Sequence, residues 1–453
     1  MSDIVRKEGV KPVRVLILGY LLLIAIGSVF LLLPISHKGH FSVIDSIFTS
    51  TSAVCVTGLI VKDTPVFFTP FGKAVLLILI QIGGIGYMSI ITLFAMLVGR
   101  KMTLQEEMMI KTSYNHVSLD DIGRFALSVL KWTVVFESVG ATIMFWRFMT
   151  KYHYSILHSL EKSIFHSVSA FCNAGFSLFS TSLVNFYNDF FIVGTIALLI
   201  ILGGLGFFVL RDISASFKKR RKISEHSKIV LISTGVLLTV GFLLILFMEY
   251  NASLANYNIG GKLFISFFQS VTARTAGFNT IGISSLTNGV LFLIIIFMFI
   301  GASPGGTGGG IKTTTFTLLI MGLRALVGSD RRIVILKRNV SESLVNRAFF
   351  IFTVSLFFVL LSYFLLLATQ GAIHNVMGLL FEELSAFGTV GLSVGSSHIA
   401  NVSLSADFNI VGKLVIMLSM VFGKIGPFSI AIALMEYQGN RNIQYPQLKM
   451  MIG

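Results

Sequence analysis

Long apolar runs alternate with shorter, half-apolar stretches along the chain. Each long run has about 20 residues, the length that a helix needs to cross a bilayer. These runs are Val13–Leu33, Ala74–Val98, Ile122–Met149, Phe190–Leu210, Ile229–Met248, Ala348–Thr369 and Phe408–Leu434. An eighth run begins near Leu291, is interrupted by GASPGGTGGG at Gly301–Gly310, and resumes at Ile311. The pattern predicts eight membrane-spanning helices, one of them discontinuous.

The shorter stretches between these runs are too short to cross a membrane as helices. They are Ser42–Gly58, His158–Gly175, Gly261–Gly277 and Asn375–Gly391. The first part of each has room for about three helical turns. We therefore expect re-entrant segments or interfacial helices at these four places.

The shorter stretches resemble one another, which indicates an internal repeat. Their last parts read TSAVCVTGL, VSAFCNAGF, VTARTAGFN and SAFGTVGL, the third offset by one residue. A second pattern follows in the next span, as GGIGY at Gly83–Tyr87, GGLGF at Gly203–Phe207, SPGG at Ser303–Gly306 and FGKIGPF at Phe422–Phe428. The chain thus divides into four predicted repeats of helix, re-entrant loop and helix, with bounds 1–110, 111–225, 226–335 and 336–453. The predicted fold is an all-α integral membrane protein with pseudo-fourfold symmetry around one pore.

Composition supports a membrane location. Hydrophobic residues make up 54% of the chain and charged residues 12%, whereas soluble domains carry about 25% charged residues. The net charge of +15 resides mostly in the tails and in short loops after the even-numbered spans, so we interpret it as topological, without a nucleic-acid partner. It predicts cytoplasmic N- and C-termini, re-entrant loops that enter from outside, and a first apolar run that is a retained helix.

A re-entrant loop is tolerated in a membrane only where it is buried in protein or lines a watery cavity. Four such loops on one axis could replace the hydration shell of a cation with backbone carbonyls, and glycine permits the dihedral angles required. The alternative is close helix packing at glycine, which is common in membranes. The predicted filter residues are Cys55, Val56, Thr57, Gly58, Cys172, Asn173, Ala174, Gly175, Arg274, Thr275, Ala276, Gly277, Gly388, Thr389, Val390 and Gly391.

The interruption at Gly301–Gly310 is too rich in glycine to form a stable helix. It must be shielded or line the pore. A phosphate-binding loop is disfavoured, because Ile311 separates the glycine run from the lysine and no β-strand is predicted before it. A plain kink without a gating function remains an alternative.

Together these segments resemble the Trk/Ktr/HKT superfamily of potassium transporters, and most closely the membrane subunit of the bacterial Ktr system. The resemblance covers the chain from Val13 to Pro446. It is carried by VTGL at Val56–Leu59, SAFCNAGFS at Ser169–Ser177, TARTAGFNT at Thr272–Thr280, GASPGGTGGGIKTTT at Gly301–Thr315 and SAFGTVGL at Ser385–Leu392.

The resemblance implies a potassium-selective pore within one subunit, a homodimer in the cell membrane, and a separate cytosolic ring of nucleotide-binding regulatory subunits. It also implies that the glycine-rich segment is an intramembrane gate beneath the filter. Lys424 stands where the family usually has arginine, which makes any barrier role softer; the alternative is a lysine that pairs with a carbonyl or an acid. The gate residues are Gly301, Ala302, Ser303, Pro304, Gly305, Gly306, Thr307, Gly308, Gly309, Gly310 and Lys424.

Other polar residues leave two interpretations open. Asp45, Glu161 and Glu383 either attract cations at the outer mouth or brace their helices. Glu137 does not pair obviously with Lys131 and is expected to be structural. We expect Cys55 and Cys172 to be free thiols near the pore axis, shielded by bound potassium. The Lys218–Lys222 run is a topology signal or a contact for a cytosolic partner or anionic lipid.

Three classes of function remain in competition. A selective cation pathway is favoured because the four repeats run in the same sense. A carrier, as a sodium-coupled potassium symporter or a less selective monovalent cation carrier, would normally have inverted repeats. An enzyme or pump is disfavoured, because the sequence has no nucleotide-binding motif and no metal-ligating cluster. We expect no covalently bound cofactor, with K⁺, and in the symporter alternative Na⁺, as the ion.

Overall fold

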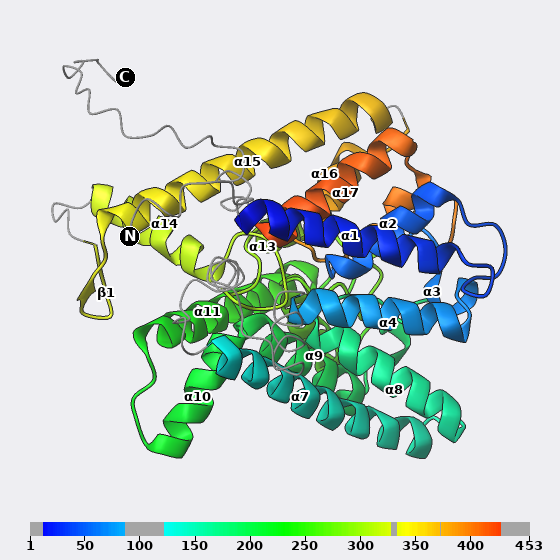
Figure 1. Cartoon of the computed structure of the whole chain (residues 1–453), viewed down its shortest axis with the longest axis horizontal. Coiled ribbons are helices and arrows are strands. Elements are labelled where there is room, and N and C mark those ends of the chain that lie inside the picture. The colour runs from blue at the N-terminus through cyan, green and yellow to red at the C-terminus, as the bar shows by residue number, and fades with distance from the viewer. Residues whose placement is uncertain (1–11, 87–121, 328–332, 372, 427–453) are drawn as a thin grey trace, which may run out of the picture.

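The computed structural model describes residues 12–86, 122–327, 333–371 and 373–426, and within these residues the chain is almost entirely helical (Figure 1). The helices of the predicted spans are α1 (Pro12–Leu32), α4 (Pro70–Ile85), α7 (Ile122–Thr150), α9 (Phe190–Leu205), α10 (Phe207–Lys219), α11 (Glu225–Glu249), α13 (Asn288–Phe299), α14 (Thr313–Val327), α15 (Glu342–Gln370) and α17 (Ile410–Ile425). The other elements are α2 (Val43–Val54), α3 (Thr64–Phe67), α8 (Ile156–Phe171), α12 (Ile259–Thr272), α16 (Val376–Phe387), the 3₁₀ turns Val184–Phe186, Ile283–Ser285 and Leu404–Asp407, and a hairpin of β1 (Val334–Ile335) and β2 (Arg338–Asn339).

Three helices of the described residues are long and apolar enough to cross a membrane: α11, α15 and the part of α7 from Phe125 to Thr150. The bent pair α9 and α10 gives a fourth span if it is counted as one. Shorter apolar helices accompany them, among them α4, α13 and α14. The chain is thus a multi-pass helical membrane protein.

One further predicted span is broken and two others stop being helical at a glycine, which corrects the expectation of a single discontinuous helix. The helices α4, α9 and α17 each end at a glycine with positive φ: Gly86 at 83°, Gly206 at 94° and Gly426 at 91°. The predicted continuous span Phe190–Leu210 is therefore wrong, because α9 and α10 meet at an angle of 96°. The ends of the spans predicted for Ala74–Val98 and Phe408–Leu434 lie outside the described residues. The glycine closes these helices because only a residue without Cβ adopts this conformation without strain.

The four predicted half-length helices are present as α2, α8, α12 and α16. Each begins at a residue whose side chain accepts a hydrogen bond from a backbone N–H in the first turn, the usual N-cap arrangement. These caps are Ser42, Ser155, Asn258 and Asn375. Each helix then ends just before one of the predicted filter segments.

The short helices are packed in a closed circle. Helix α8 contacts α4, α12 contacts α9, and α16 contacts α13, so each lies against the helix that follows the previous short helix. The first short helix, α2, contacts α17 at the far end of the chain. Figure 1 shows the result as blue and orange helices side by side.

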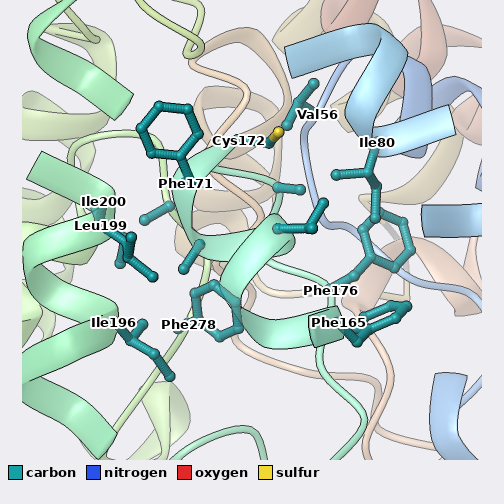
Figure 2. Close-up of a cluster of buried hydrophobic side chains, with 14 of the residues drawn as sticks. Val56, Ile80, Phe165, Phe171, Cys172, Phe176, Ile196, Leu199, Ile200 and Phe278 are labelled. Atoms are coloured by element: carbon teal, nitrogen blue, oxygen red, sulfur yellow. The ribbon is translucent and has the colours of Figure 1, made fainter. Parts of the chain in front are cut away.

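Apolar side chains fill the space around the end of α8. Figure 2 shows Cys172, at this end, next to Val56, whereas Ile196, Leu199 and Ile200 of α9 lie on the opposite side of α8. All five are at most 3% exposed, and this packing fixes where the segment after α8 lies.

Candidate ion pathway

Four glycines follow the short helices, and all four adopt positive φ. The angles are 94° at Gly58, 71° at Gly175, 80° at Gly277 and 87° at Gly391. A side chain at any of them would strain the backbone. The glycines that were predicted from sequence to end the filter segments therefore share one conformation.

The residue two positions before each glycine also has positive φ, although none of these residues is glycine. The angles are 57° at Val56, 58° at Asn173, 72° at Thr275 and 50° at Thr389. Val56, Thr275 and Thr389 are β-branched, and positive φ at β-branched residues is rare and is typical of functional sites. Such alternation of backbone handedness can turn successive carbonyl groups towards one side of the chain, as a carbonyl-lined filter requires.

The four glycines form a closed ring in chain order. A Cβ added to Gly58 would lie 3.0 Å from Cα of Gly175, and one added to Gly175 would lie 3.0 Å from Cα of Gly277. From Gly277 the corresponding distance to Cα of Gly391 is 3.3 Å, and from Gly391 to Cα of Gly58 it is 3.0 Å. Each added Cβ would also meet the carbonyl oxygen just before the next glycine, so only glycine fits all four positions.

A hydroxyl in the last turn of each short helix holds the segment that follows. The hydroxyls of Ser52 and Ser385 each accept a hydrogen bond at 3.0 Å from the N–H of the glycine that ends the predicted filter segment, Gly58 and Gly391 respectively. Those of Ser169 and Thr272 donate to the carbonyls of Phe176 and Phe278 at 2.7 and 2.6 Å. The sequence interpretation missed these four residues, although a recurring Ser-Ala or Thr-Ala pair six or five residues before the glycine marks them.

The segment Gly301–Gly310 is an irregular loop, as expected. Its two ends lie side by side. The N–H of Gly301 donates to the carbonyl of Ile311 at 2.9 Å. Farther along, the N–H groups of Ser303 and Thr307 donate to the carbonyls of Gly204 and Gly203 in α9 at 3.0 and 3.2 Å. The loop thus satisfies its backbone groups within protein, as non-helical backbone at membrane depth must.

The loop is also bonded to one of the predicted filter segments. The N–H of Gly309 donates to Oγ1 of Thr389 at 2.8 Å. A Cβ added to Gly308 would overlap Oγ1 of Thr275. Both threonines are among the strained residues described above, so the loop lies directly against two of the four predicted filter segments.

Cationic side chains bind the carbonyls of this loop. The Nζ atom of Lys424, from α17, donates to the carbonyl of Thr307 at 2.5 Å, and Nζ of Lys312 donates to that of Gly308 at 2.6 Å. A guanidinium nitrogen of Arg274 lies 3.5 Å from the carbonyl of Gly301. Lys424 therefore does pair with a carbonyl, and that carbonyl belongs to the predicted gate.

The acidic residues of the short helices brace them. Asp45 pairs with Lys413 of α17 at 2.7 Å, and Glu161 pairs with Lys73 of α4 at 3.0 Å. Each pair joins a short helix to the neighbouring helix in the circle. Glu383 accepts a hydrogen bond at 2.7 Å from Ser419 of α17.

Glu137 is held by other side chains, as expected of a structural residue, but the sequence did not indicate which side chains these are. Its carboxylate accepts hydrogen bonds from Nε2 of Gln81 at 3.1 Å, and the thiol of Cys172 lies 3.9 Å from it. Cys55 and Cys172 are free and buried. Their predicted shielding by potassium stays a prediction.

The family model described as "cation transport protein", TrkH, matches residues 15–444 of the chain. The chain is a member of the TrkH family. This is a family of transporters and not of enzymes. Within the described residues of this TrkH-family chain, no group of three or more His, Cys, Asp and Glu side chains could hold a metal ion.

The chain is 35% identical over 444 residues to the Ktr system potassium uptake protein B of Bacillus subtilis, a match that covers 98% of this chain and 97% of that protein. It is 34% identical over 451 residues to the protein of the same name from Vibrio alginolyticus, covering 99% and 96%. A potassium/sodium uptake protein, NtpJ of Enterococcus hirae, is 35% identical over 464 residues, covering 100% and 99%.

The fold of this TrkH-family chain is similar to the crystal structure of the potassium transporter TrkH from Vibrio parahaemolyticus. The TM-score is 0.75 at 20% sequence identity, over 95% of this chain and 86% of the other. At this level of identity the similarity establishes the fold alone.

Proposed function

We propose that this chain takes up potassium across the cell membrane through a selectivity-filter pore. The observation that carries the proposal is the closed ring of Gly58, Gly175, Gly277 and Gly391. Backbone carbonyls next to such a ring replace the hydration shell of a dehydrated cation, and their number and spacing favour potassium over sodium. The potassium uptake proteins at 34–35% identity over nearly the whole chain support the choice of ion.

The pore is built from four repeats with eight membrane spans, and both termini are cytoplasmic. The circle of contacts between each short helix and the preceding span supports this arrangement, in particular the contact of α2 with α17. The short helices end at the filter segments, so the negative ends of their dipoles face the cation. The basic residues of the loops after the even-numbered spans support the orientation.

The loop Gly301–Gly310 is the gate. Its bonds to Thr389 and to Gly203 and Gly204 support a position directly beneath the filter. The free-energy cost of changing its conformation is low, because a glycine-rich segment has little tendency to form a helix. Lys424 contributes a positive charge that repels an incoming cation.

The chain works as a homodimer together with a cytosolic ring of nucleotide-binding subunits. The word "system" in the names of the Ktr relatives supports a protein with further subunits. A ring on the cytoplasmic side would act on the gate loop through the helices next to it.

A sodium-coupled uptake of potassium is the second candidate. Its support is the potassium/sodium uptake protein at 35% identity, to which the match is as long as the chain itself. In this version sodium shares the pathway or drives it.

Reconstituted protein separates the two candidates. We expect potassium and rubidium flux to follow an imposed membrane potential at about 2.3 kcal/mol per charge per 100 mV, and sodium flux to be much smaller. A requirement for sodium on the uptake side would favour the coupled version. Equal fluxes of potassium and sodium in folded protein would overturn the filter assignment.

A further inference from the structure

Two ammonium groups bind consecutive carbonyls of the gate loop. Lys424 Nζ lies 2.5 Å from the carbonyl oxygen of Thr307, and Lys312 Nζ lies 2.6 Å from that of Gly308. The next residue, Gly309, donates its N–H to Thr389 of the filter. Two positive charges are thus held at the part of the loop that contacts a filter segment.

Neither ammonium is neutralised within the described part of the chain, where no carboxylate pairs with Lys312 or Lys424. Two like charges on adjacent carbonyls repel each other, and the repulsion is strong where water is scarce. Such an arrangement raises the free energy of the closed loop. The two lysines therefore do not serve to stabilise the fold, and we look for a functional role.

The two lysines belong to different segments of the chain. Lys424 belongs to the last turn of α17. Lys312 belongs to the exit of the loop itself, directly before α14 (Thr313–Val327), and it bonds to a carbonyl four residues earlier. When the loop moves, Lys312 can move with it, whereas Lys424 has to release Thr307.

We propose that Lys312 is a second gate cation, which holds a positive charge beneath the filter together with Lys424. The two ammonium groups occupy carbonyls that a dehydrated potassium ion would otherwise use, since both are monovalent cations that bind carbonyl oxygens. Potassium passes only when the loop withdraws and takes Lys312 along. This inference rests on the proposed function of the loop as a gate.

The test is potassium flux into liposomes that contain the full-length protein without regulatory subunits. The variants are Lys312→Met, which keeps the length of the side chain, Lys312→Gln, which keeps an N–H donor for Gly308, and Lys312→Arg, which keeps the charge. We expect both Met and Gln to raise the flux about tenfold, because each removes one like charge from the path. Arg should stay close to the parent protein. Combined with Lys424→Met, the Met variant should exceed either single variant.

A matched control is Lys262, a buried lysine that also binds a carbonyl, that of Tyr250 at 2.7 Å, and does not contact the loop. Lys262→Met should leave the flux unchanged. If Lys312→Gln behaves as the parent while Lys312→Met does not, the hydrogen bond and not the charge matters, and the inference is overturned. Unchanged flux in Lys312→Met, with a parental melting temperature and with Lys424→Met raised, also overturns it. A parent protein that carries no potassium selectively would instead refute the proposed function.

Discussion

Gly391, in the last predicted filter segment, lies against Gly58, in the first: a Cβ on Gly391 would be 3.0 Å from Cα of Gly58 and would overlap the carbonyl oxygen of Thr57. The two residues are 333 positions apart in the chain of 453 residues. Their contact closes the ring of four glycines without a covalent link, so the dimensions of the ring depend on how all four segments pack.

Replacing a ring glycine should reduce the preference for potassium. In Gly277→Ser, the new Cβ would lie 2.5 Å from the carbonyl oxygen of Val390, and φ of +80° is unfavourable for serine. The carbonyls must shift, and we expect the flux ratio of potassium to sodium to fall about tenfold or more. Ion fluxes in liposomes measure this ratio.

Gly39→Ser is the control for this substitution. Gly39 has φ of +97°, but a Cβ there would meet nothing within 4 Å, so its backbone strain is similar and it does not touch the ring. Selectivity should remain as in the parent. If Gly277→Ser also keeps the parental ratio in folded protein, the ring does not set selectivity.

The hydroxyl of Thr389 should couple the gate to the filter. Thr389→Val removes the acceptor for the N–H of Gly309 and keeps the shape of the side chain. Leaving this buried N–H unpaired costs about 1–3 kcal/mol, which weakens the closed loop, so flux without regulatory subunits should rise. Thr389→Ser keeps the hydroxyl and should therefore have the parental flux. A raised flux in this variant would indicate that the packing of the side chain, and not the hydrogen bond, is responsible.

Shortening the gate loop should open the pathway. Deletion of Pro304–Gly306 removes the carbonyl of Gly305, which accepts a hydrogen bond from Phe207 at 3.1 Å, and pulls the remaining loop away from the filter. We expect higher flux and weaker dependence on the regulatory subunits, measured with and without them. A folded deletion variant with parental flux and regulation would make the loop a packing element.

The ion pair of Asp45 and Lys413 should stabilise the contact of α2 with α17. Their side chains are 13% and 11% exposed, and breaking so buried a pair by Asp45→Asn should cost about 3–5 kcal/mol. A lower melting temperature of the detergent-solubilised protein is the expected result. The exposed pair of Arg338 and Glu225, 3.9 Å apart, is the comparison, and Glu225→Gln should cost less than about 0.5 kcal/mol.

Asp189 should make the stability of the fold depend on pH in the acidic range. Burial raises the pKa of its carboxyl, but hydrogen bonds from Lys151 and Arg147 outweigh burial and leave the pKa below its ordinary value of 3.8. Because the folded pKa is the lower one, this contribution is complete above the ordinary value and is lost as the pH falls through the folded pKa. Asp189→Asn should therefore lower the melting temperature at neutral pH. The difference from the parent should shrink below about pH 4, and a constant difference would contradict this.

The sequence by itself determined the elements whose signals are local. The half-length helices α2, α8, α12 and α16 follow from the length of apolar stretches and from capping residues such as Ser42 and Asn375. The four glycines of the predicted filter could be found because the same short pattern recurs after each of these helices. The irregular loop Gly301–Gly310 was visible because so much glycine excludes a helix.

Tertiary structure decided what depends on residues far apart in the chain. Apolar length alone predicted one long helix across Gly206, because a single glycine is only weakly unfavourable in a helix; its break is fixed by packing against the carbonyl of Pro304 in the gate loop. Asp45 was ambiguous until Lys413 was found beside it. Lys312 received no role at all, because a lysine at the end of a glycine run carries no local sign that its ammonium folds back onto Gly308, next to the carbonyl that Lys424 binds. The packing of the helices determines which carbonyl group each lysine binds. The residue pattern of a single segment does not give this information.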